Sequence, residues 1–257
     1  MKLPCFDLTE KLAIVSGGAT GIGRGIAEGL AEAGAKIVII ARRLEVCEQA
    51  CVEIEKKYGV ETFPFRCDIT NSTEIRDVVG EIVNSCGHIN ILVNNAGVSG
   101  SEKKILEMTE EDWDKVLNTN LKAVFTLTKE VVTQMINQGN GGKIINVASI
   151  GALVGWPNMS AYCASKGGCV QLTKVMALEW VRHNIQVNSL LPGYFETPMN
   201  TGFFSSDTGQ TVIKSTIPMK RLAQIEEIKG AAILLASQSS NFMTGSSLVI
   251  DGGQTSC

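Results

Sequence analysis

The chain has 257 residues, of which 44% are hydrophobic and 19% charged, with a formal net charge of −3. This composition excludes a disordered protein, and the slight acidity offers no basic surface for nucleic acid or an anionic membrane. The length suits one substantial core, and no apolar run reaches the eighteen or so residues of a membrane span, so we expect a single domain over 1–257.

The cysteines and histidines exclude two further classes of site. Eight cysteines are scattered without a C-x-x-C pair, which indicates reduced thiols rather than a disulfide framework. With no basic leader ahead of an apolar segment, we expect a cytoplasmic protein. The two histidines, His88 and His183, are too few for a multi-histidine cage, so we expect no metal site.

Apolar, β-branched runs alternate with helical patterns along the chain. Continuous apolar strands separated by helices predict a parallel sheet covered on both faces, which is a doubly wound α/β fold. Asn71 with Glu74 and Thr109 with Asp112 indicate helix starts, because each pair places a capping residue three positions ahead of an acid. Strands are expected at 12–16, 37–41, 62–67, 91–95, 143–149, 185–191 and 248–251, and helices at 22–33, 44–58, 75–86 and 159–182.

The first strand leads into a glycine-rich turn with the pattern G-x-x-x-G-x-G. Its glycines allow the backbone to approach a bulky anion, and the following helix directs its free N–H groups toward that anion. Strand, turn and helix predict a dinucleotide phosphate site, and the alternative is a glycine-rich connection without a ligand. The cofactor contacts expected here are Ser16, Gly17, Thr20, Gly21, Ile22 and Gly23.

The end of the second strand indicates which dinucleotide binds. An acid there binds the ribose 2′-hydroxyl, whereas its absence together with an arginine favours a 2′-phosphate. Here Ala41 is followed by Arg42 and Arg43, and a guanidinium can hold a phosphate with two hydrogen bonds. NADP(H) is therefore favoured over NAD(H), unless both arginines merely begin the next helix in solvent. Beyond the third and fourth strands, the adenine and second ribose could contact Asp68, Ile69, Asn95, Ala96 and Gly97.

The stretch from Thr197 to Pro218 breaks the alternating pattern. It is rich in Gly, Ser, Thr and aromatic residues, lacks clear periodicity, and follows a strand end, where ligands of open α/β sheets bind. We interpret it as a mobile lid at about 197–218. The alternative is an ordinary surface loop.

Ser149, Tyr162 and Lys166 are candidates for chemistry. Tyr162 and Lys166 lie four apart in a helical pattern, so they project from one face and place an ammonium beside a phenol. Alone, such a pair is more often structural, and Ser149 could be only a helix cap. Because Ser149 closes a strand of the parallel sheet, however, it should reach the same carboxyl edge as the glycine turn.

The chain resembles the short-chain dehydrogenase/reductase family from Leu8 to Gly253. The resemblance implies a single-domain Rossmann fold with a seven-stranded parallel sheet, often tetrameric. It also implies transfer of a hydride between a nicotinamide and a secondary alcohol or ketone. Six motifs in one order carry it: Ser16-Gly17-x-x-x-Gly21-x-Gly23, Asn94-Asn95-Ala96-Gly97, Asn120 in Leu117-Asn-Thr-Asn-Leu121, Ser149, Tyr162-x-x-x-Lys166 and Pro192-Gly193.

Roles follow from the resemblance, motif by motif. Tyr162 would be the general acid/base, and Lys166 would hold the nicotinamide ribose and favour the phenolate. Ser149 would orient the substrate oxygen and Asn120 would position a proton-relay water. Ser16 stands where threonine is usual, which preserves the hydroxyl. The further cofactor contacts expected are Tyr162, Lys166, Pro192, Gly193 and Thr197.

The substrate is less well defined than the reaction. One family branch reduces 3-oxoacyl groups on an acidic carrier protein and has basic residues beside the entrance of the active site. This chain has 137–140, of sequence NQGN, and His183 in the corresponding regions, which gives little electrostatic steering. Walls are expected from Gly151, Leu153, Val154, Trp156, Tyr194, Met199, Phe203 and Phe204.

We therefore expect a small free substrate, such as a sugar acid or polyol, by similarity to the gluconate dehydrogenase branch. The alternatives are a 3-oxoacyl-[acyl-carrier-protein] reductase, an enzyme for steroids or other bulky alcohols, and a dinucleotide-binding regulator without catalysis. A complete Ser149, Tyr162, Lys166 and Asn120 set argues against the regulator, because a sensor needs no acid/base.

Overall fold

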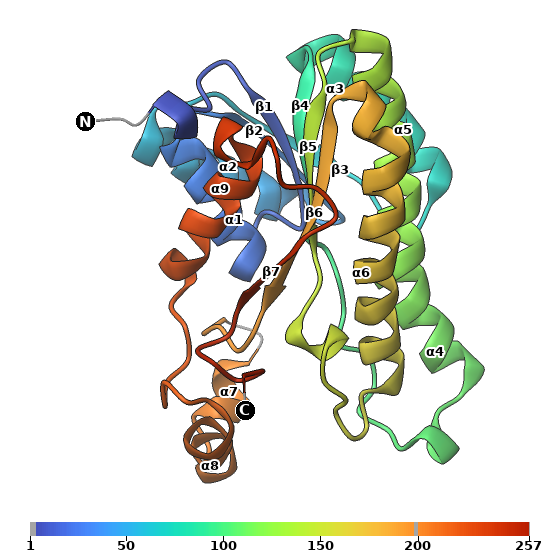
Figure 1. Ribbon diagram of the computed structural model, residues 1–257, viewed down its shortest axis with the longest axis vertical. Coiled ribbons are helices and arrows are strands. Elements are labelled where there is room, and N and C mark those ends of the chain that lie inside the picture. The colour runs from blue at the N-terminus through green and yellow to red at the C-terminus, as the bar shows by residue number, and fades with distance from the viewer. Residues whose placement is uncertain (1–3, 198–199, 257) are drawn as a thin grey trace.

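A seven-stranded parallel sheet forms the centre of the computed structural model, which describes residues 4–197 and 200–256 (Figure 1). Its strand order, β3-β2-β1-β4-β5-β6-β7, confirms the doubly wound α/β class. The reversal of order between β1 and β4 is the crevice where open sheets bind ligands. The strands are β1 (Leu12–Ser16), β2 (Lys36–Ala41), β3 (Thr62–Arg66), β4 (Ile89–Asn94), β5 (Gly142–Val147), β6 (Ile185–Pro192) and β7 (Ser247–Ile250).

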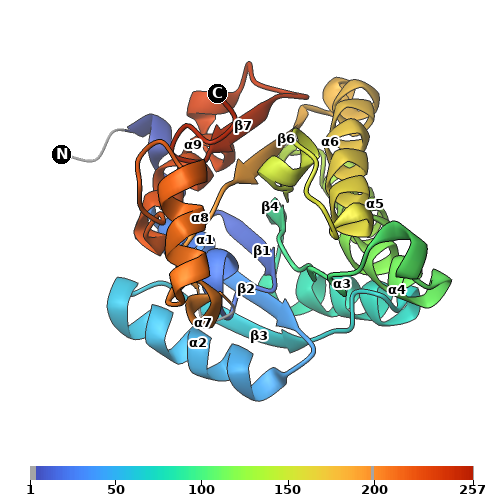
Figure 2. The ribbon, with the colours of Figure 1, turned by 90° about the horizontal axis from the view of Figure 1, so that it is seen from below.

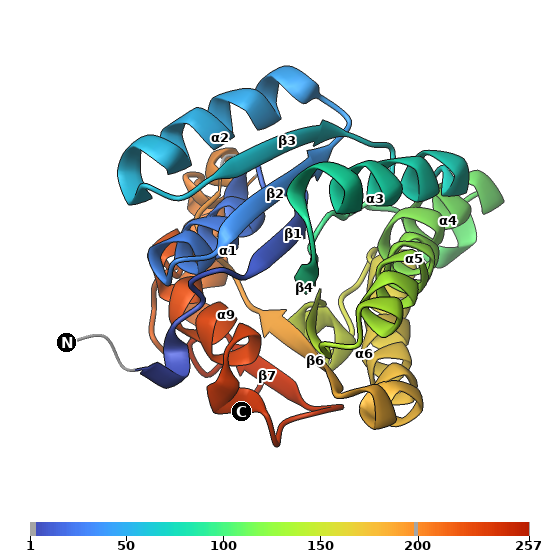
Figure 3. The same cartoon turned by 90° about the horizontal axis from the view of Figure 1, so that it is seen from above.

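Helices cover both faces of the sheet. Seen from above, α1, α2 and α9 lie on one side and α3, α5 and α6 on the other (Figure 3). This arrangement explains why the strands read as continuous apolar runs. The α-helices are α1 (Gly21–Glu32), α2 (Leu44–Tyr58), α3 (Ser72–Cys86), α4 (Glu110–Leu117), α5 (Ala123–Gln138), α6 (Ser160–Trp180), α7 (Thr201–Phe204), α8 (Asp207–Thr216) and α9 (Lys229–Ala236).

Alternating side chains of each strand enter two separate cores. Ala13 and Val15 of β1 pack with Ile26 of α1, in a cluster that also contains side chains from α2 and α9. Leu12 and Ile14 enter the opposite cluster, built with α3, α5 and α6. All five residues of β1 are buried, so the strand ends at Ser16 in a fixed position beside the crevice.

Both helix starts marked in the sequence carry caps. Thr109 and Asp112 form a reciprocal capping box at α4. At α3 the Asn71 side chain accepts from the backbone amides of Thr73 and Glu74, while the Glu74 carboxylate accepts from the Asp68 backbone amide and from Asn71 Nδ2, not from the Asn71 backbone amide. The acid therefore braces the loop after β3 rather than completing a box.

The stretch 197–218 contains two helices, which its weak periodicity did not indicate. The Ser206 side chain accepts from the Gly209 amide and starts α8. Phe204, Ile213 and Ile217 then form a small core of their own, against which the partly buried Tyr194, Val212 and Leu222 pack. Met199, expected as a substrate wall, lies outside the described residues.

The carboxyl ends of the strands form one edge of the molecule, seen from below in Figure 2. The segments that follow β6 and β7 come together at this edge. The Gly193 amide donates to the Ile250 carbonyl, and the Met219 amide to the Gly252 carbonyl. The chain after β7 therefore packs between the end of β6 and the segment after α8.

Lys143 is buried at the opposite end of the sheet, with only 9% of its surface exposed. Its Nζ donates to Asn241 Oδ1 (2.8 Å) and Ser240 Oγ (3.3 Å), neither of which carries charge. Burial lowers the pKa of the Lys143 ammonium to about 8. The folded protein thus binds this proton more weakly than the unfolded chain does.

We expect Lys143 to make the protein gain stability between pH 8 and 10.5. In that window the unfolded chain holds a proton that the folded protein has released, so the free energy of unfolding rises with pH. Comparing urea unfolding of the wild type with Lys143→Met isolates this effect from the other groups that titrate there. The wild type should gain up to about 3 kcal/mol on the variant across the window, at about 1.4 kcal/mol per pH unit, and parallel pH profiles would contradict the assignment.

Candidate functional site

The glycine turn between β1 and α1 leaves backbone donors free at the crevice. Gly17 (φ 65°) and Gly21 (φ 55°) adopt left-handed conformations that favour glycine. Thr20 is the N-cap of α1, but its side chain makes no capping hydrogen bond. The amides in the first turn of this twelve-residue helix are therefore available to an anion, as a dinucleotide pyrophosphate requires.

Side chains from β1 and β4 fix the shape of this turn. The Ser16 hydroxyl accepts from the amides of Asn95 (3.0 Å) and Ala96 (3.2 Å). In return, Asn95 Nδ2 donates to the carbonyls of Ser16 (3.0 Å) and Gly17 (3.2 Å). A Cβ at Gly23 would meet both Asn95 Nδ2 and the Gly17 carbonyl oxygen, so only glycine fits there. The turn and the start of the loop after β4 thus form one unit.

The end of β2 presents two unpartnered cations. Arg42 and Arg43 are exposed, and within residues 4–197 and 200–256 neither side chain forms an ion pair or a hydrogen bond. Beyond β3, Asp68 Oδ1 accepts from the amide and hydroxyl of Thr70, which lowers the pKa of the Asp68 carboxyl, and the nearby Arg42 lowers it further. Ile69 packs against the core on the α3 side.

Asn120 lies in a π-helical turn, η3 (Asn118–Lys122), between α4 and α5. Its side chain is 1% exposed and fully engaged: Oδ1 accepts from the Val98 amide, while Nδ2 donates to the Val98 carbonyl and to Ser165 Oγ. A water positioned by Asn120 would therefore have to bind its backbone carbonyl. π-Turns of this kind are common at functional sites.

Asn94, which precedes the expected contact Asn95, belongs to a buried network that the sequence did not reveal. Its Nδ2 donates to Thr128 Oγ1 and to Asn146 Oδ1, both at 2.8 Å. Asn146 in turn donates to Thr173 Oγ1 on α6 (2.9 Å). The network joins β4 and β5 to α5 and α6, so it fixes the strand ends against the helix that carries Tyr162.

Ser149 and Tyr162 meet around Gly151. A Cβ placed on Gly151 would lie 3.5 Å from Ser149 Oγ, 3.3 Å from Tyr162 Cε1 and 3.2 Å from a ring carbon of Trp156. Ser149 lies beyond β5, which ends at Val147, rather than closing the strand as expected; it caps the short helix η4 (Ile150–Ala152). The Gly151 amide donates to Ser149 Oγ, which leaves the hydroxyl proton free for another acceptor.

Lys166 is one turn beyond Tyr162 on α6 and is 5% exposed. Its Nζ donates to the Val147 carbonyl (2.8 Å) and lies 5.8 Å from the centre of the Tyr162 ring. A Cβ at Gly97 would be 3.6 Å from this Nζ and 3.1 Å from Asn120 Oδ1. The structure therefore brings the ammonium, the phenol ring and the Asn120 amide to the same edge of the sheet.

The segment after β6 reaches back to the glycine turn. A Cβ at Gly21 would lie 3.6 Å from Thr197 Cγ2, so the expected contact Thr197 borders the turn. Pro192 ends β6, and Gly193 approaches Asp251 so closely that a Cβ would lie 2.8 Å from the Asp251 backbone. Thr197 thus lies beside the glycine turn, whereas Gly193 packs against the start of the chain after β7.

Aromatic rings form one wall beside Tyr162. Trp156 stacks on Tyr162, and Tyr194 stacks on the far side of Trp156. Burial raises the pKa of the Tyr194 phenol. The other expected wall residues are Leu153, Val154 and Phe203, which are exposed, and Phe204, which is buried.

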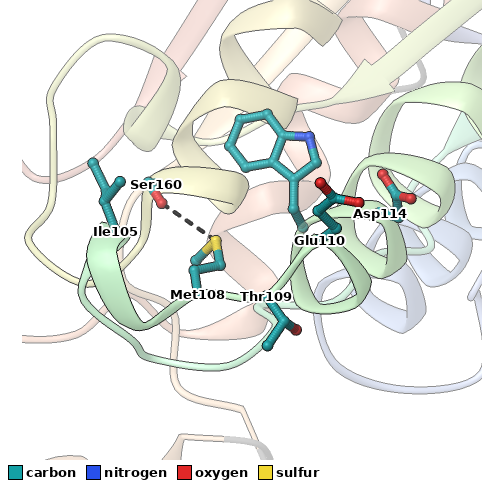
Figure 4. Close-up of a pocket in the computed structure, with 7 residues that line it drawn as sticks. Ile105, Met108, Thr109, Glu110, Asp114 and Ser160 are labelled. Carbon is teal, nitrogen blue, oxygen red and sulfur yellow. Dashed lines mark hydrogen bonds between the residues drawn. The ribbon is translucent and has the colours of Figure 1, made fainter.

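A separate cavity of about 420 Å³ opens beside the start of α6 (Figure 4). Ser160 Oγ donates to Met108 Sδ across it (3.6 Å). None of the four expected catalytic residues lines this cavity, so it is distinct from the candidate site. The lining consists of Ile105, Met108, Thr109, Glu110, Trp113, Asp114 and Ser160.

The described part of the chain holds neither a metal-binding cluster nor a membrane-spanning helix. Among residues 4–197 and 200–256, no group of three or more His, Cys, Asp or Glu side chains could hold a metal ion. None of the described helices combines the length and apolar character that crossing a membrane requires.

Nearly the whole chain is similar to known proteins. Residues 17–255 match the family model described as enoyl-(acyl carrier protein) reductase. The chain is 38% identical over 255 residues to 2-dehydro-3-deoxy-D-gluconate 5-dehydrogenase of Escherichia coli K12, covering 98% of each chain. It is 37% identical over 246 residues to a 3-oxoacyl-[acyl-carrier-protein] reductase of Thermotoga maritima, covering 96% of this chain and 98% of the relative.

Among solved structures, the gluconate 5-dehydrogenase of Burkholderia cenocepacia J2315, in complex with NADP and tartrate, is similar throughout. The TM-score is 0.94 at 36% sequence identity, and the match covers 99% of this chain and 98% of that chain.

Proposed function

The chain belongs to the short-chain dehydrogenase/reductase family and is an NAD(P)-dependent dehydrogenase acting on CH–OH groups, and we propose that its cofactor is NADP(H) and its substrate a small polar ketone or alcohol. A sugar acid or polyol is the proposed class. The observation that carries the catalytic assignment is the convergence of Ser149 and Tyr162 around Gly151, with Lys166 beside the same phenol.

Each residue has a defined task in this proposal. When bound, the cofactor supplies the hydride for reduction or accepts it in oxidation. Tyr162 donates a proton to the ketone oxygen in reduction and takes the hydroxyl proton in oxidation. Ser149 donates its free hydroxyl proton to the same oxygen, because its own oxygen is already held by Gly151. Lys166 keeps two of its three N–H groups for the nicotinamide ribose after binding Val147.

The residues that follow β2, where a ribose 2′-phosphate would bind, support NADP(H) as the cofactor. The free guanidinium of Arg42 follows β2 without an acid beside it in sequence, and two relatives with solved structures are described with bound NADP. The glycine turn between β1 and α1 also suits a pyrophosphate, since the first backbone amides of α1 have no side-chain capping partner.

We expect Arg42→Ala to raise the KM for NADPH about tenfold or more while changing that for NADH less than twofold, because one charged hydrogen-bonded contact is worth about 1.5–3 kcal/mol. Initial rates at the nicotinamide absorbance measure both constants. Arg76→Ala, which removes an exposed arginine of α3, is the matched control. Equal losses with the two cofactors would remove the case for the phosphate contact.

The test of the proposed function is a screen of substrates with both cofactors. Sugar acids, ketoses, a simple 3-oxoacyl ester and a steroid ketone are each reduced with NADPH and with NADH. Turnover of polar ketones with NADPH supports the proposal. Preferential turnover of the 3-oxoacyl ester, as the similarity to the Thermotoga relative would allow, or of the steroid would replace the substrate class.

We further propose a cytoplasmic homotetramer. The seven described cysteines are free thiols, as a reducing compartment favours. Apolar side chains are exposed on the neighbouring helices α5 and α6, namely Phe125 (49%), Val175 (45%) and Leu178 (79%), and a second copy of the chain would cover them. Light scattering of the purified protein tests the tetramer.

A further inference from the structure

A row of aromatic rings begins at Tyr162. The Trp156 and Tyr162 ring centres are 6.1 Å apart with an angle of 12° between planes, and Trp156 and Tyr194 are 5.7 Å apart at 15°. Both separations fall within the range for offset stacking. Trp156 is therefore held between two tyrosine rings, one of which is the proposed acid/base.

The row continues into the helices that follow β6. Tyr194 meets Phe204 of α7 edge to face, with centres 5.0 Å apart and planes at 62°. Phe204 is 5% exposed and is packed with Ile213 and Ile217 of the α8 region, against which Tyr194 also packs. The far end of the row is thus anchored in a small hydrophobic core.

Trp156 is half-buried, and its carbonyl accepts from the Met159 amide. It lies in the segment between η4 and α6, where Leu153, Val154, Gly155, Pro157 and Asn158 are all exposed. The glycine at 151 provides the room for its ring, since a Cβ there would lie 3.2 Å from Trp156 and 3.3 Å from Tyr162. Stacking on Tyr162 and Tyr194 therefore contributes to where this indole lies.

We propose that Trp156 and Tyr194 are positioning residues: stacked between Phe204 of α7 and Tyr162, they hold the ring of the catalytic phenol in its reactive orientation. The inference rests on the proposed acid/base function of Tyr162. Trp156 restrains the Tyr162 ring by stacking on it, and Tyr194 transmits the packing of the α7 and α8 core to Trp156. Neither residue exchanges a proton with the substrate.

The test compares ring-removing with ring-keeping substitutions. Trp156→Leu should lower kcat about tenfold, because displacing a reacting group lowers the rate steeply, while the KM values for ketone and cofactor stay within about twofold. Trp156→Phe keeps a ring in the stack and should recover most of the rate. A raised ketone KM with unchanged kcat would show that Trp156 contacts substrate, which overturns the proposal, as would full activity of Trp156→Leu.

Ring-keeping and ring-removing substitutions at Tyr194 give an independent test if Trp156→Leu does not fold. Tyr194→Phe should keep kcat and Tyr194→Leu should lower it several-fold. If the phenylalanine variant loses as much as the leucine variant, the hydroxyl matters and the stacking role is wrong. The double variant Trp156→Leu with Phe204→Leu should lose less than the product of the single losses, because both substitutions break one row. Independent effects would contradict a continuous row.

Tyr162→Phe separates this inference from the proposed function. If Tyr162→Phe is inactive and Trp156→Leu retains its rate, only the positioning role fails. If Tyr162→Phe remains active, the catalytic assignment itself fails. The thermal midpoint and NADPH dissociation constant of each variant show whether the fold and the cofactor site are intact.

Discussion

Replacing Tyr162 by phenylalanine should lower kcat for ketone reduction at least about a hundredfold, the usual contribution of a positioned general acid. Only the phenol oxygen is lost in this variant. The ring keeps its stack on Trp156 and its approach to the Lys166 ammonium, which is 5.8 Å from the ring centre. NADPH affinity should therefore stay within about twofold of the wild type. Steady-state rates and a fluorescence titration with NADPH measure the two quantities.

Tyr58→Phe is the matched control for the loss of a phenol oxygen. The Tyr58 hydroxyl donates to Glu28 Oε2 (2.8 Å) and accepts from Lys229 Nζ (3.0 Å), in an ion network that joins α1, α2 and α9. Its removal should lower the thermal midpoint and leave kcat unchanged. The third tyrosine, Tyr194, retains its hydroxyl in both variants. If Tyr162→Phe retained more than a tenth of the wild-type kcat, another group would have to donate the proton.

The sheet and most helices were predictable because their patterns are local. Strands β1, β2 and β6 are buried on both faces, so each appears as a largely apolar run, and the parallel order follows from the intervening helices. The glycine turn was also visible, since left-handed φ at Gly17 and Gly21 demands glycine. These features need no knowledge of distant contacts.

Residue contacts that cross the sheet were not predictable in the same way. Asn94, Asn146 and Thr173 lie on three different elements, and nothing in their sequence spacing indicates one buried network. Trp156 and Tyr194 were each expected as substrate walls, but their mutual stacking depends on how the ends of β5 and β6 approach. The two helices within 201–216 escaped detection because their buried apolar side chains, Phe204 and Ile213, are too few to set a clear period.

The sequence was sufficient to place Asn120 and Ser149 in the site, but it did not predict their local geometry. The resemblance placed both in the site, yet the Asn120 side chain is engaged with Val98 and Ser165, and Ser149 caps η4 beyond the strand end. The order of the motifs along the chain indicates which residues belong to the site. The direction in which each hydrogen bond runs depends on the folded backbone.

We expect Gly23→Ala to weaken NADPH binding about tenfold to a hundredfold. The added Cβ would meet Asn95 Nδ2 and the Gly17 carbonyl oxygen, so α1 must shift or the Asn95 bridge to the turn must break. Overpacking of this kind costs about 1–3 kcal/mol, which corresponds to roughly that range in the dissociation constant. Fluorescence titration with NADPH, well below the thermal midpoint, measures the loss on folded protein.

Gly80→Ala makes the same chemical change where it should be harmless. Gly80 lies within α3, and nothing surrounds the position of its missing Cβ within 4 Å. The control variant should bind NADPH as the wild type does and gain up to about 1 kcal/mol of stability from its better helix propensity. Both substitutions add one methyl group to a helix. A difference in NADPH affinity between the two variants therefore reports the close contact of Gly23 with Asn95 and the glycine turn. Wild-type affinity in Gly23→Ala would show that the first turn of α1 does not hold the cofactor's phosphates.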